Sequence, residues 1–313
     1  MYPPFGPDLI SIGPLHIRWY AVCILTGAVV AAWFGAWRAA RAGHNPEHAW
    51  NFMSLGLVAA IIAARLWYVF FEWNDRFAPR WVSFTSNPGA NWQDFIFIIN
   101  PATGGIAIQG GLMGAMLSSY WYARRHALPF GIWANFAAPC IPIGQVFGRW
   151  GNFFNQEAYG RPTGLPWGLH LTSRGCPTTD PNCHRVGQFR DLVQYPDATR
   201  FHPTFLYEAL WNVGVIAGLL WIERQFRRWV LPGDLMLLYF MLYSVGRFWV
   251  EGFRVDSLCT GGIGGECQGQ LRTAQVTAIG TFLVCGTILI YRHWRNSGTA
   301  RPMERVEQPA TQA

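Results

Sequence analysis

The sequence contains no lysine and few charged residues of either sign. All 24 basic residues are arginine, Asp and Glu together number 17, and charged residues make up 13% of the 313 positions. An average soluble protein carries roughly 25% charge, so this chain is short of side chains that face water. Hydrophobic residues account for 51%. This composition argues against an ordinary soluble domain and favours a membrane protein.

Seven apolar runs are long enough to cross a bilayer as helices, which takes about 20 residues each. The predicted spans are 18–38, 50–71, 104–122, 131–150, 204–222, 234–251 and 273–291. Two prolines interrupt the fourth. The sequence therefore predicts an all-α polytopic integral membrane protein, built as a single membrane domain over residues 1–295.

The formal net charge of +7 is compatible with nucleic-acid binding, but the distribution of the arginines is not. They cluster just beyond alternate spans, as Arg38 and Arg41, Arg124 and Arg125, Arg224, Arg227 and Arg228, and Arg292 and Arg295. By the positive-inside rule these ends are cytoplasmic, which puts the N-terminus outside and the C-terminus inside. We expect no nucleic-acid partner. Residues 1–17 lack a basic n-region and a cleavage site, so the first span is expected to remain as an anchor.

Two large outer loops, each rich in Pro, Asn, Asp and Thr, and a polar tail lie outside the spans. The outer loop covers about 72–103, and the segment of about 155–203 is long enough to form a small extracytoplasmic head. Residues 296–313 are polar and lack periodicity, which predicts a disordered cytoplasmic tail.

Four cysteines fall in the predicted outer loops, where disulfides can persist. Short flexible segments separate Cys176 from Cys183 and Cys259 from Cys267, so we expect two local bridges. The other three cysteines, Cys23, Cys140 and Cys285, lie in apolar segments and are interpreted as buried packing residues.

Polar and charged side chains recur at the outer ends of the spans. They are Arg18, Tyr20, Arg65, Arg149, Glu208, Arg247 and Glu251. A single arginine can snorkel to the headgroups, and a tyrosine can belong to the aromatic belt. Neither explanation covers glutamates in the same layer. Arg247 and Glu251 are four residues apart and can pair on one helix face. The layer predicts a pocket for an anionic lipid headgroup in the outer leaflet, because guanidinium forks suit phosphate oxygens.

The densest polar stretch is GRWGNFFNQEAYGR, residues 148–161, where the fourth span ends. Arg149 supplies charge, Asn152 and Asn155 supply amides, and Glu157 and Gly160 lead the chain into the head. A second stretch, TGGIAIQGGLMG at 103–114, has five glycines. These allow either close helix packing or close approach of the backbone to a ligand, and the sequence leaves both open.

These motifs resemble prolipoprotein diacylglyceryl transferase, whose signature is close to G-R-x-G-N-F-x-N-x-E-x-x-G. Further matches are RWY at 18–20, ARLWYVFF at 64–71, HPTFLYE at 202–208 and YSVGRFWVEGFR at 243–254. The resemblance implies a bacterial inner-membrane enzyme of seven spans. It would transfer the diacylglyceryl group of phosphatidylglycerol to the lipobox cysteine of preprolipoproteins. Functional positions of the family map onto Tyr20, Arg149, Asn152, Glu157, Gly160, Tyr243, Arg247 and Glu251. No cofactor or metal is expected, since the sequence shows no clustered zinc-type ligands.

The polar layer and the resemblance together predict the following roles. Arg149 and Arg247 act on the phosphate as catalytic residues, together with Glu251 and Tyr243. The expected substrate-binding residues are Tyr20, Arg65, Gln109, Gly110, Asn152, Asn155, Glu157, Gly160, His202 and Glu208. Where the family commonly has a histidine before the paired glycines, this chain has Gln109, which cannot act as a base. The departing phosphate or Glu251 then takes the proton, with His202 as a rival base.

Two other classes of protein remain as alternatives. A lipid or anion transporter also needs intramembrane arginines, but it is expected to show repeats and a site near the midplane. A structural scaffold has no need to concentrate unlike charges on four spans. A transfer assay separates all three.

Overall fold

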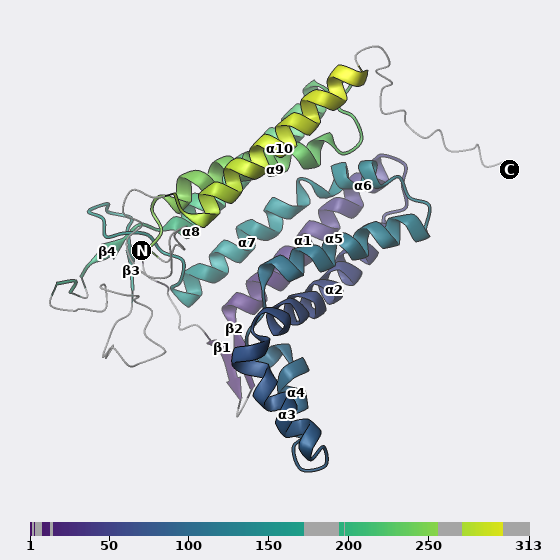
Figure 1. Ribbon diagram of the computed structural model, residues 1–313. Coiled ribbons are helices and arrows are strands. Elements are labelled where there is room, and N and C mark those ends of the chain that lie inside the picture. The colour runs from purple at the N-terminus through teal and green to yellow at the C-terminus, as the bar shows by residue number, and fades with distance from the viewer. Residues whose placement is uncertain are drawn as a thin grey trace. The chain divides into compact units, whose positions relative to one another are not determined.

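The computed structural model of the chain describes residues 1, 3, 8–12, 15–171, 194–196, 198–255 and 271–296, which are mostly helical (Figure 1). Residues 297–313 of the predicted tail lie outside this description, as do all four cysteines of the predicted disulfides. Contacts divide the chain into two compact units. Unit 1 comprises Met1–Gly35 and Gly131–Ala313, and unit 2 comprises Ala36–Phe130. Each is described by itself.

Five helical segments are long and apolar enough to cross a membrane. They are Trp19–Arg41 (α1), Glu47–Phe71 (α2), Phe130–Asn155 (α6 and α7), Thr204–Gln225 (α8) and Thr273–Asn296 (α10). The third contains a break, because α6 (Phe130–Ala137) ends just before Pro139 and α7 (Cys140–Asn155) begins after it. Two further helices, α5 (Ile108–Arg125) and α9 (Asp234–Glu251), have 18 residues each and cover the other two predicted spans. The prediction of a helical membrane protein is confirmed at this level, and the count of seven stays a prediction.

In unit 1 the helices pack in order, α7 on α8, α8 on α9 and α9 on α10. The first part of α1 contacts α7 at Gly27, where an added Cβ would lie 2.8 Å from the Cβ of Phe147. One cluster of buried side chains joins the end of α7, the start of α8 and the strands β3 (Leu169–His170) and β4 (Arg200–Phe201). A second lies between α8 and α9, around Leu219 and Leu235. The first cluster therefore holds the end of α7 against the start of α8, and the second holds the end of α8 against the start of α9.

The N-terminal hairpin of unit 1 pairs β1 (Asp8–Ile12) with β2 (Leu15–Arg18) in antiparallel register, and β1 is exposed along its length. It leads directly into α1 at Trp19. Strands β3 and β4 pair antiparallel as well, with Leu169 opposite Phe201. Because Phe201 is fully buried, this pair anchors the segment that enters α8.

Unit 2 is built on the packing of α2 against α5. A Cβ at Gly110 would lie 2.5 Å from the Cβ of Trp67, and one at Gly114 would lie 2.5 Å from the carbonyl oxygen of Ala59. Only glycine allows backbones to approach so closely. The packing interpretation therefore accounts for these two glycines.

The predicted outer loop of unit 2 is largely helical, with η1 (Trp73–Phe77), α3 (Ala78–Ser86), α4 (Trp92–Ile99) and η2 (Pro101–Thr103). Helices α3 and α4 pack through the stacked rings of Phe84 and Phe95, 5.1 Å apart, and the Arg80–Asp94 ion pair at 2.8 Å. The Pro, Asn and Asp residues that suggested a loop thus stand mainly at helix ends and turns.

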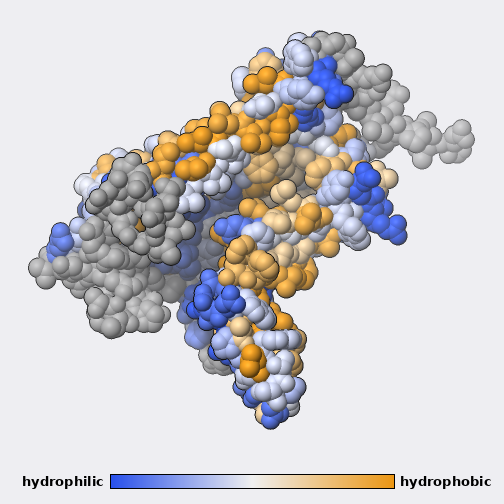
Figure 2. All heavy atoms as spheres, in the orientation of Figure 1, coloured by the Kyte–Doolittle hydropathy of each residue, from blue (hydrophilic) through white to orange (hydrophobic). Residues whose placement is uncertain are grey.

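Large apolar side chains cover the outward helix faces, and Figure 2 shows hydrophobic residues along the visible face of α10. On α10, Leu283 and Ile290 are exposed, as are Leu66 and Phe70 on α2. Continuous apolar surface of this kind is unusual on a soluble monomer. It fits helices surrounded by lipid.

Candidate functional site

The end of α7, the start of α8 and the end of α9 with the residues just after it bring three arginines to one buried carboxylate. Glu208, in the second turn of α8, contacts Arg149 of α7 through its Oε2 atom. Its Oε1 atom accepts from Nη1 of Arg247 on α9 at 3.3 Å and lies 3.8 Å from Nη1 of Arg254. Glu208 is only 6% exposed. One anionic group therefore bridges the two arginines that the sequence predicts to be catalytic.

Arg247 has a second carboxylate partner, as its spacing from Glu251 predicts. Nη2 of Arg247 lies 2.7 Å from Oε2 of Glu251, one helical turn further along α9. Glu251 is buried at the end of the helix, where its backbone carbonyl accepts from the guanidinium of Arg272. Arg272 also donates to the carbonyl of Arg254 at 2.9 Å, so it ties the last residue of α9 to the segment that follows.

The side chains of the signature segment form a chain of hydrogen bonds that ends on Arg149. Nη1 of Arg149 donates to Oδ1 of Asn152 at 3.2 Å, and Nδ2 of Asn152 donates to Oε1 of Glu157 at 2.9 Å. Asn155 donates to the same carboxylate oxygen at 3.3 Å. Asn152 accepts from the arginine and donates to the glutamate, so its amide orientation is determined by its neighbours. The predicted set of Arg149, Asn152, Asn155 and Glu157 is brought together.

The chain leaves α7 through two residues in the left-handed region, Gln156 at φ 52° and Ala158 at φ 56°. Gly160 then donates from its backbone N–H to the carbonyl of His202 at 2.9 Å. A Cβ at Gly160 would lie 2.7 Å from the Cβ of His202 and 2.9 Å from the carbonyl oxygen of Phe253. Gly160 therefore allows the segments that follow α7, precede α8 and follow α9 to cross in close contact.

Two predicted tyrosines also belong to this part of unit 1. The ring of Tyr20, at the start of α1, packs on Gly151, where an added Cβ would lie 2.7 Å from Cδ2 of the ring. Tyr243 lines a small cavity together with Glu208, Trp211, Asn212, Gly246, Arg247 and Val250. The indole of Trp211 donates to the carbonyl of Leu242 at 3.0 Å. These contacts place both tyrosines beside the arginine–glutamate cluster.

His202 precedes α8, and its imidazole is directed to aromatic neighbours. Its Nδ1 atom lies 3.0 Å from the hydroxyl of Tyr207, and its ring centroid lies 5.1 Å from that of Phe253. Burial lowers the pKa of His202 below its ordinary value of 6.5. The imidazole is therefore neutral at pH 7.

Three predicted substrate-binding residues lie in unit 2. The buried guanidinium of Arg65 donates to backbone carbonyls and one hydroxyl within the same unit, a pattern unlike that of Arg149 or Arg247. Gly110 is buried in the contact between α2 and α5, whereas the side chain of Gln109 is exposed in the first turn of α5. Their part in substrate binding stays a prediction.

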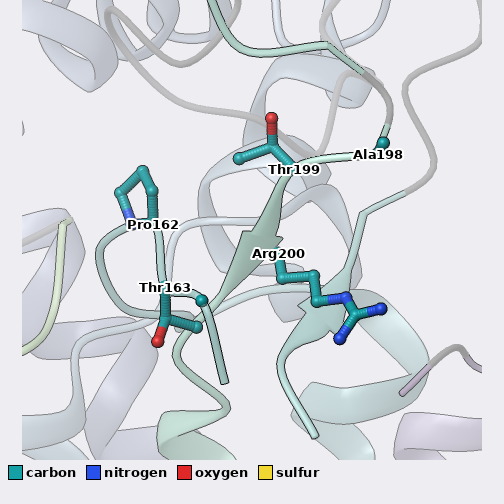
Figure 3. A pocket seen from close by; sticks show the side chains of 6 residues that line it. Pro162, Thr163, Ala198, Thr199 and Arg200 are labelled. Carbon is teal, nitrogen blue, oxygen red and sulfur yellow. The ribbon is translucent and has the colours of Figure 1, made fainter. Parts of the chain in front are cut away.

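A pocket shown in Figure 3 shares no lining residue with this cluster. It encloses about 490 Å³ and is lined by Pro162, Thr163, Gly164, Ala198, Thr199 and Arg200. Its one charged group is the guanidinium of Arg200, which donates to the carbonyl of Pro166 at 3.2 Å. Charge geometry rather than pocket volume therefore identifies the candidate site. Over the described residues, no three His, Cys, Asp or Glu side chains are grouped to hold a metal ion.

Arg254, Arg272 and Asn212 belong to the surroundings of the site although the sequence analysis did not select them. Arg254 lies three residues beyond Glu251, and Arg272 immediately precedes the last span. The rule that selected the other arginines, a charge at the outer end of a span, applies to Arg272 as well. Asn212 lies one helical turn beyond Glu208 on the same face, and this spacing is its signal.

The apolar helices and the buried cluster of arginines and glutamates define a polytopic membrane protein with a site suited to an anion. The family model for prolipoprotein diacylglyceryl transferase matches residues 7–291. The phosphatidylglycerol–prolipoprotein diacylglyceryl transferase of Chloroflexus aggregans is 46% identical over 96% of each chain. The enzyme of the same name from Gloeobacter violaceus is 38% identical over 95% of each chain. The one from Synechococcus elongatus is 35% identical over 97% of this chain and 92% of the relative. The chain belongs to the prolipoprotein diacylglyceryl transferase family.

Proposed function

We propose that the chain transfers the diacylglyceryl group of phosphatidylglycerol to the thiol of the lipobox cysteine of preprolipoproteins. The products are a thioether-linked lipid and glycerol phosphate, and the reaction is the first step of lipoprotein maturation. The family match over most of the chain supports this activity. The observation that carries it is the contact of Arg149 and Arg247 with the single carboxylate of Glu208.

The contacts of Glu208 with two arginines resemble those that a phosphodiester would make with them. A carboxylate and a phosphodiester each carry one negative charge and offer two oxygens to guanidinium donors. Since one carboxylate reaches both Arg149 and Arg247, one phosphate can also reach both. Each guanidinium has five N–H donors, so pairing with a carboxylate leaves others for a ligand. The two arginines would bind the lipid phosphate, with Glu208 and Glu251 orienting them.

In the proposed reaction the cysteine thiolate attacks the glycerol carbon that carries the phosphate. A carbon–sulfur bond forms, and the carbon–oxygen bond breaks. Its electron pair remains on the phosphate oxygen and adds charge to the leaving glycerol phosphate. Fixed guanidinium groups stabilise this charge in a site poor in water, which is usually the largest catalytic contribution. Tyr20 and Asn152 position the headgroup, and Tyr243 lies beside Arg247 in the cavity.

The thiol proton leaves before or during attack. A cysteine with pKa ≈ 8.5 is already a few per cent thiolate at pH 7, and nearby guanidinium groups lower that pKa. The departing phosphate, or Glu251, accepts the proton in this scheme. Gln109 does not titrate and would serve as a hydrogen-bonding residue for substrate. The contact of His202 with Tyr207 supports a structural role for this imidazole.

We further propose seven spans, with the N-terminus outside and the site toward the extracytoplasmic face of the bacterial inner membrane. An 18-residue helix is about 27 Å long, close to the ~30 Å hydrocarbon thickness, so α5 and α9 are long enough to span. Arginine or histidine occupies the last turn of α1, α5, α8 and α10, whereas the last turns of α2 and α7 lack basic residues. This alternation supports the proposed orientation.

The activity is tested with purified protein, phosphatidylglycerol vesicles and a synthetic lipobox peptide. We expect a peptide whose mass rises by one diacylglyceryl group, with stoichiometric release of glycerol phosphate. A peptide with serine in place of the lipobox cysteine is the matched control and stays unmodified. Lipid binding or flux without modified peptide would instead indicate a transporter.

A further inference from the structure

The guanidinium of Arg65, on α2 of unit 2, has five contacts for its five N–H donors. Nε donates to the carbonyl of Ile98 at 2.9 Å. Nη1 donates to the carbonyl of Gly105 at 2.9 Å and also to that of Gly104. Nη2 donates to Oγ1 of Thr103 at 3.1 Å and to the carbonyl of Phe97. Arg65 is 4% exposed.

Four of the five acceptors are backbone carbonyls at a helix end and a turn, and that of Phe97 also accepts from the hydroxyl of Thr103 at 3.4 Å. Phe97 and Ile98 lie in the last turn of α4, where helix carbonyls lack intrahelical partners. Gly104 and Gly105 both have positive φ, at 84° and 74°, so the chain turns sharply there. Arg65 thus caps one helix and closes the turn that follows it.

The same turn leads into α5, and close contacts with α2 continue along it. An added Cβ at Gly105 would lie 2.7 Å from Cδ1 of Tyr68. The backbone N–H of Ala107 donates to the carbonyl of Ala64 at 3.1 Å, next to Arg65 in sequence. Gly110 then packs on Trp67, which fixes the first turn of α5 against α2. The exposed side chain of Gln109 projects from this fixed turn.

We propose that Arg65 is a positioning residue that holds residues 97–105 closed and thereby fixes the start of α5 and Gln109. It does not bind the lipid phosphate, because a phosphate would have to displace acceptors that the fold supplies. The functional half of this inference rests on the proposed function, in which Gln109 hydrogen-bonds substrate. The structural half stands on the contacts of Arg65 alone.

A double-mutant cycle tests the coupling of Arg65 to Gln109. We measure kcat/KM for phosphatidylglycerol-dependent transfer with wild type, Arg65→Lys, Gln109→Ala and the double variant, all below their unfolding temperatures. Each single change should lower kcat/KM by about tenfold, which is the effect of losing about one hydrogen bond to a charged group. If both act through one element, the double variant should also lose about tenfold, since coupled residues are non-additive. Arg80→Lys is the control and should stay near wild type, because lysine retains a cation for the ion pair with Asp94 and over the ring of Phe97.

Loss of about a hundredfold in the double variant, the product of independent effects, would overturn the proposal. So would activity in Arg65→Lys equal to that of Arg80→Lys. If Arg65→Lys does not fold, Thr103→Val removes a single acceptor while keeping the arginine. We then expect Thr103→Val to lower kcat/KM by less than tenfold. Combined with Gln109→Ala, it should again lower kcat/KM by less than the product of the two single effects, and a loss equal to that product counts against coupling.

Hydrogen exchange separates this inference from the proposed function. Amides of residues 97–107 should exchange faster in Arg65→Lys, or in Thr103→Val, than in Arg80→Lys. Unchanged exchange would show that Arg65 does not hold the turn. Absence of transfer in wild type would refute the proposed function, while the exchange result would still decide the role of Arg65.

Discussion

The arginines that the sequence predicts to bind substrate have two kinds of partner in the two units. In unit 2, Arg65 is almost fully buried and donates to carbonyl and hydroxyl oxygens of its own unit. In unit 1, the side chains of Arg149 and Arg247 are 20% and 21% exposed and pair with carboxylates. In both environments the N–H groups of the guanidinium have oxygen acceptors. The difference is that Arg65 donates to neutral oxygens fixed by the backbone and one hydroxyl, whereas Arg149 and Arg247 pair with anionic groups, which is the basis of the proposal that they bind a phosphate.

Replacing Arg149 or Arg247 should have the largest effect on transfer. A lysine keeps the charge but has no planar fork for two phosphate oxygens. We expect Arg→Ala to abolish transfer and Arg→Lys to lower kcat/KM by about 10²–10³, as for removal of one oxyanion donor. The measurement is peptide lipidation at saturating and limiting phosphatidylglycerol. Near-normal turnover in both lysine variants would exclude bidentate recognition.

Glu208 is the next position at which unit 1 can be perturbed. Glu208→Gln keeps the shape and one acceptor oxygen but removes the charge that bridges Arg149 and Arg247. We expect a loss of about 1–3 kcal/mol of stability, typical of hydrogen bonds to charged groups, together with reduced transfer. Thermal unfolding and lipidation are measured on the same preparation, with Glu208→Asp as the charge-preserving control. A glutamine variant with wild-type stability and activity would contradict the bridging role.

Substitutions in unit 2 should change the free energy of unfolding, and two adjacent glycines provide a matched pair of variants. A methyl group at Gly110 would clash with Trp67, whereas at Gly111 it would meet Ala60 and Ala64 at ordinary distances of 3.6 and 3.7 Å. We expect Gly110→Ala to cost about 1–3 kcal/mol, as overpacking does. Gly111→Ala should be neutral or slightly stabilising. Equal unfolding temperatures for the two variants would argue against glycine-mediated packing of α5 on α2.

His202 should show the smallest effect on activity. We expect His202→Gln to keep transfer within about threefold of wild type, whereas loss of a general base costs about 10²–10⁴. Because the folded-state pKa is lowered, the unfolded chain binds the proton more readily, and stability falls as pH drops below about 6.5. The glutamine variant should lack this part of the acid sensitivity in thermal unfolding. A folded but inactive His202→Gln would identify this imidazole as the base.

The sequence predicts the site better in unit 1 than in unit 2. The i, i+4 spacing of Arg247 and Glu251 is enough to predict their pair, and the signature segment brings Arg149, Asn152 and Glu157 together locally. Glu208 and Arg247 lie on different helices, α8 and α9, far apart in sequence. The position of Glu208 between two arginines therefore depends on the packing of α8, which periodicity does not reveal. The break at Pro139 is readable from the residue types alone.

Unit 2 differs because its local signals have two physical explanations. An arginine near the end of a span suits lipid phosphate and helix carbonyls equally well, so Arg65 alone does not predict its partners. The same holds for Gly110, for which packing and ligand approach require the same small side chain. Residues 72–103 are predicted only as a connection between spans, because their turn-forming residues obscure the two short amphipathic helices α3 and α4.

The central claim is that Arg149 and Arg247 bind the lipid phosphate while Arg65 does not. It is tested by the rise in unfolding temperature when a short-chain phosphatidylglycerol is added to wild type, Arg247→Lys and Arg65→Lys. At about 100 times Kd, a ligand that binds the folded state adds about 2.7 kcal/mol. We predict that Arg65→Lys unfolds at a lower temperature and keeps about half of the lipid-induced rise, as about tenfold weaker binding through Gln109 implies, whereas Arg247→Lys loses the rise. A full rise in Arg247→Lys, or its loss in folded Arg65→Lys, would contradict this assignment of the two arginine sites.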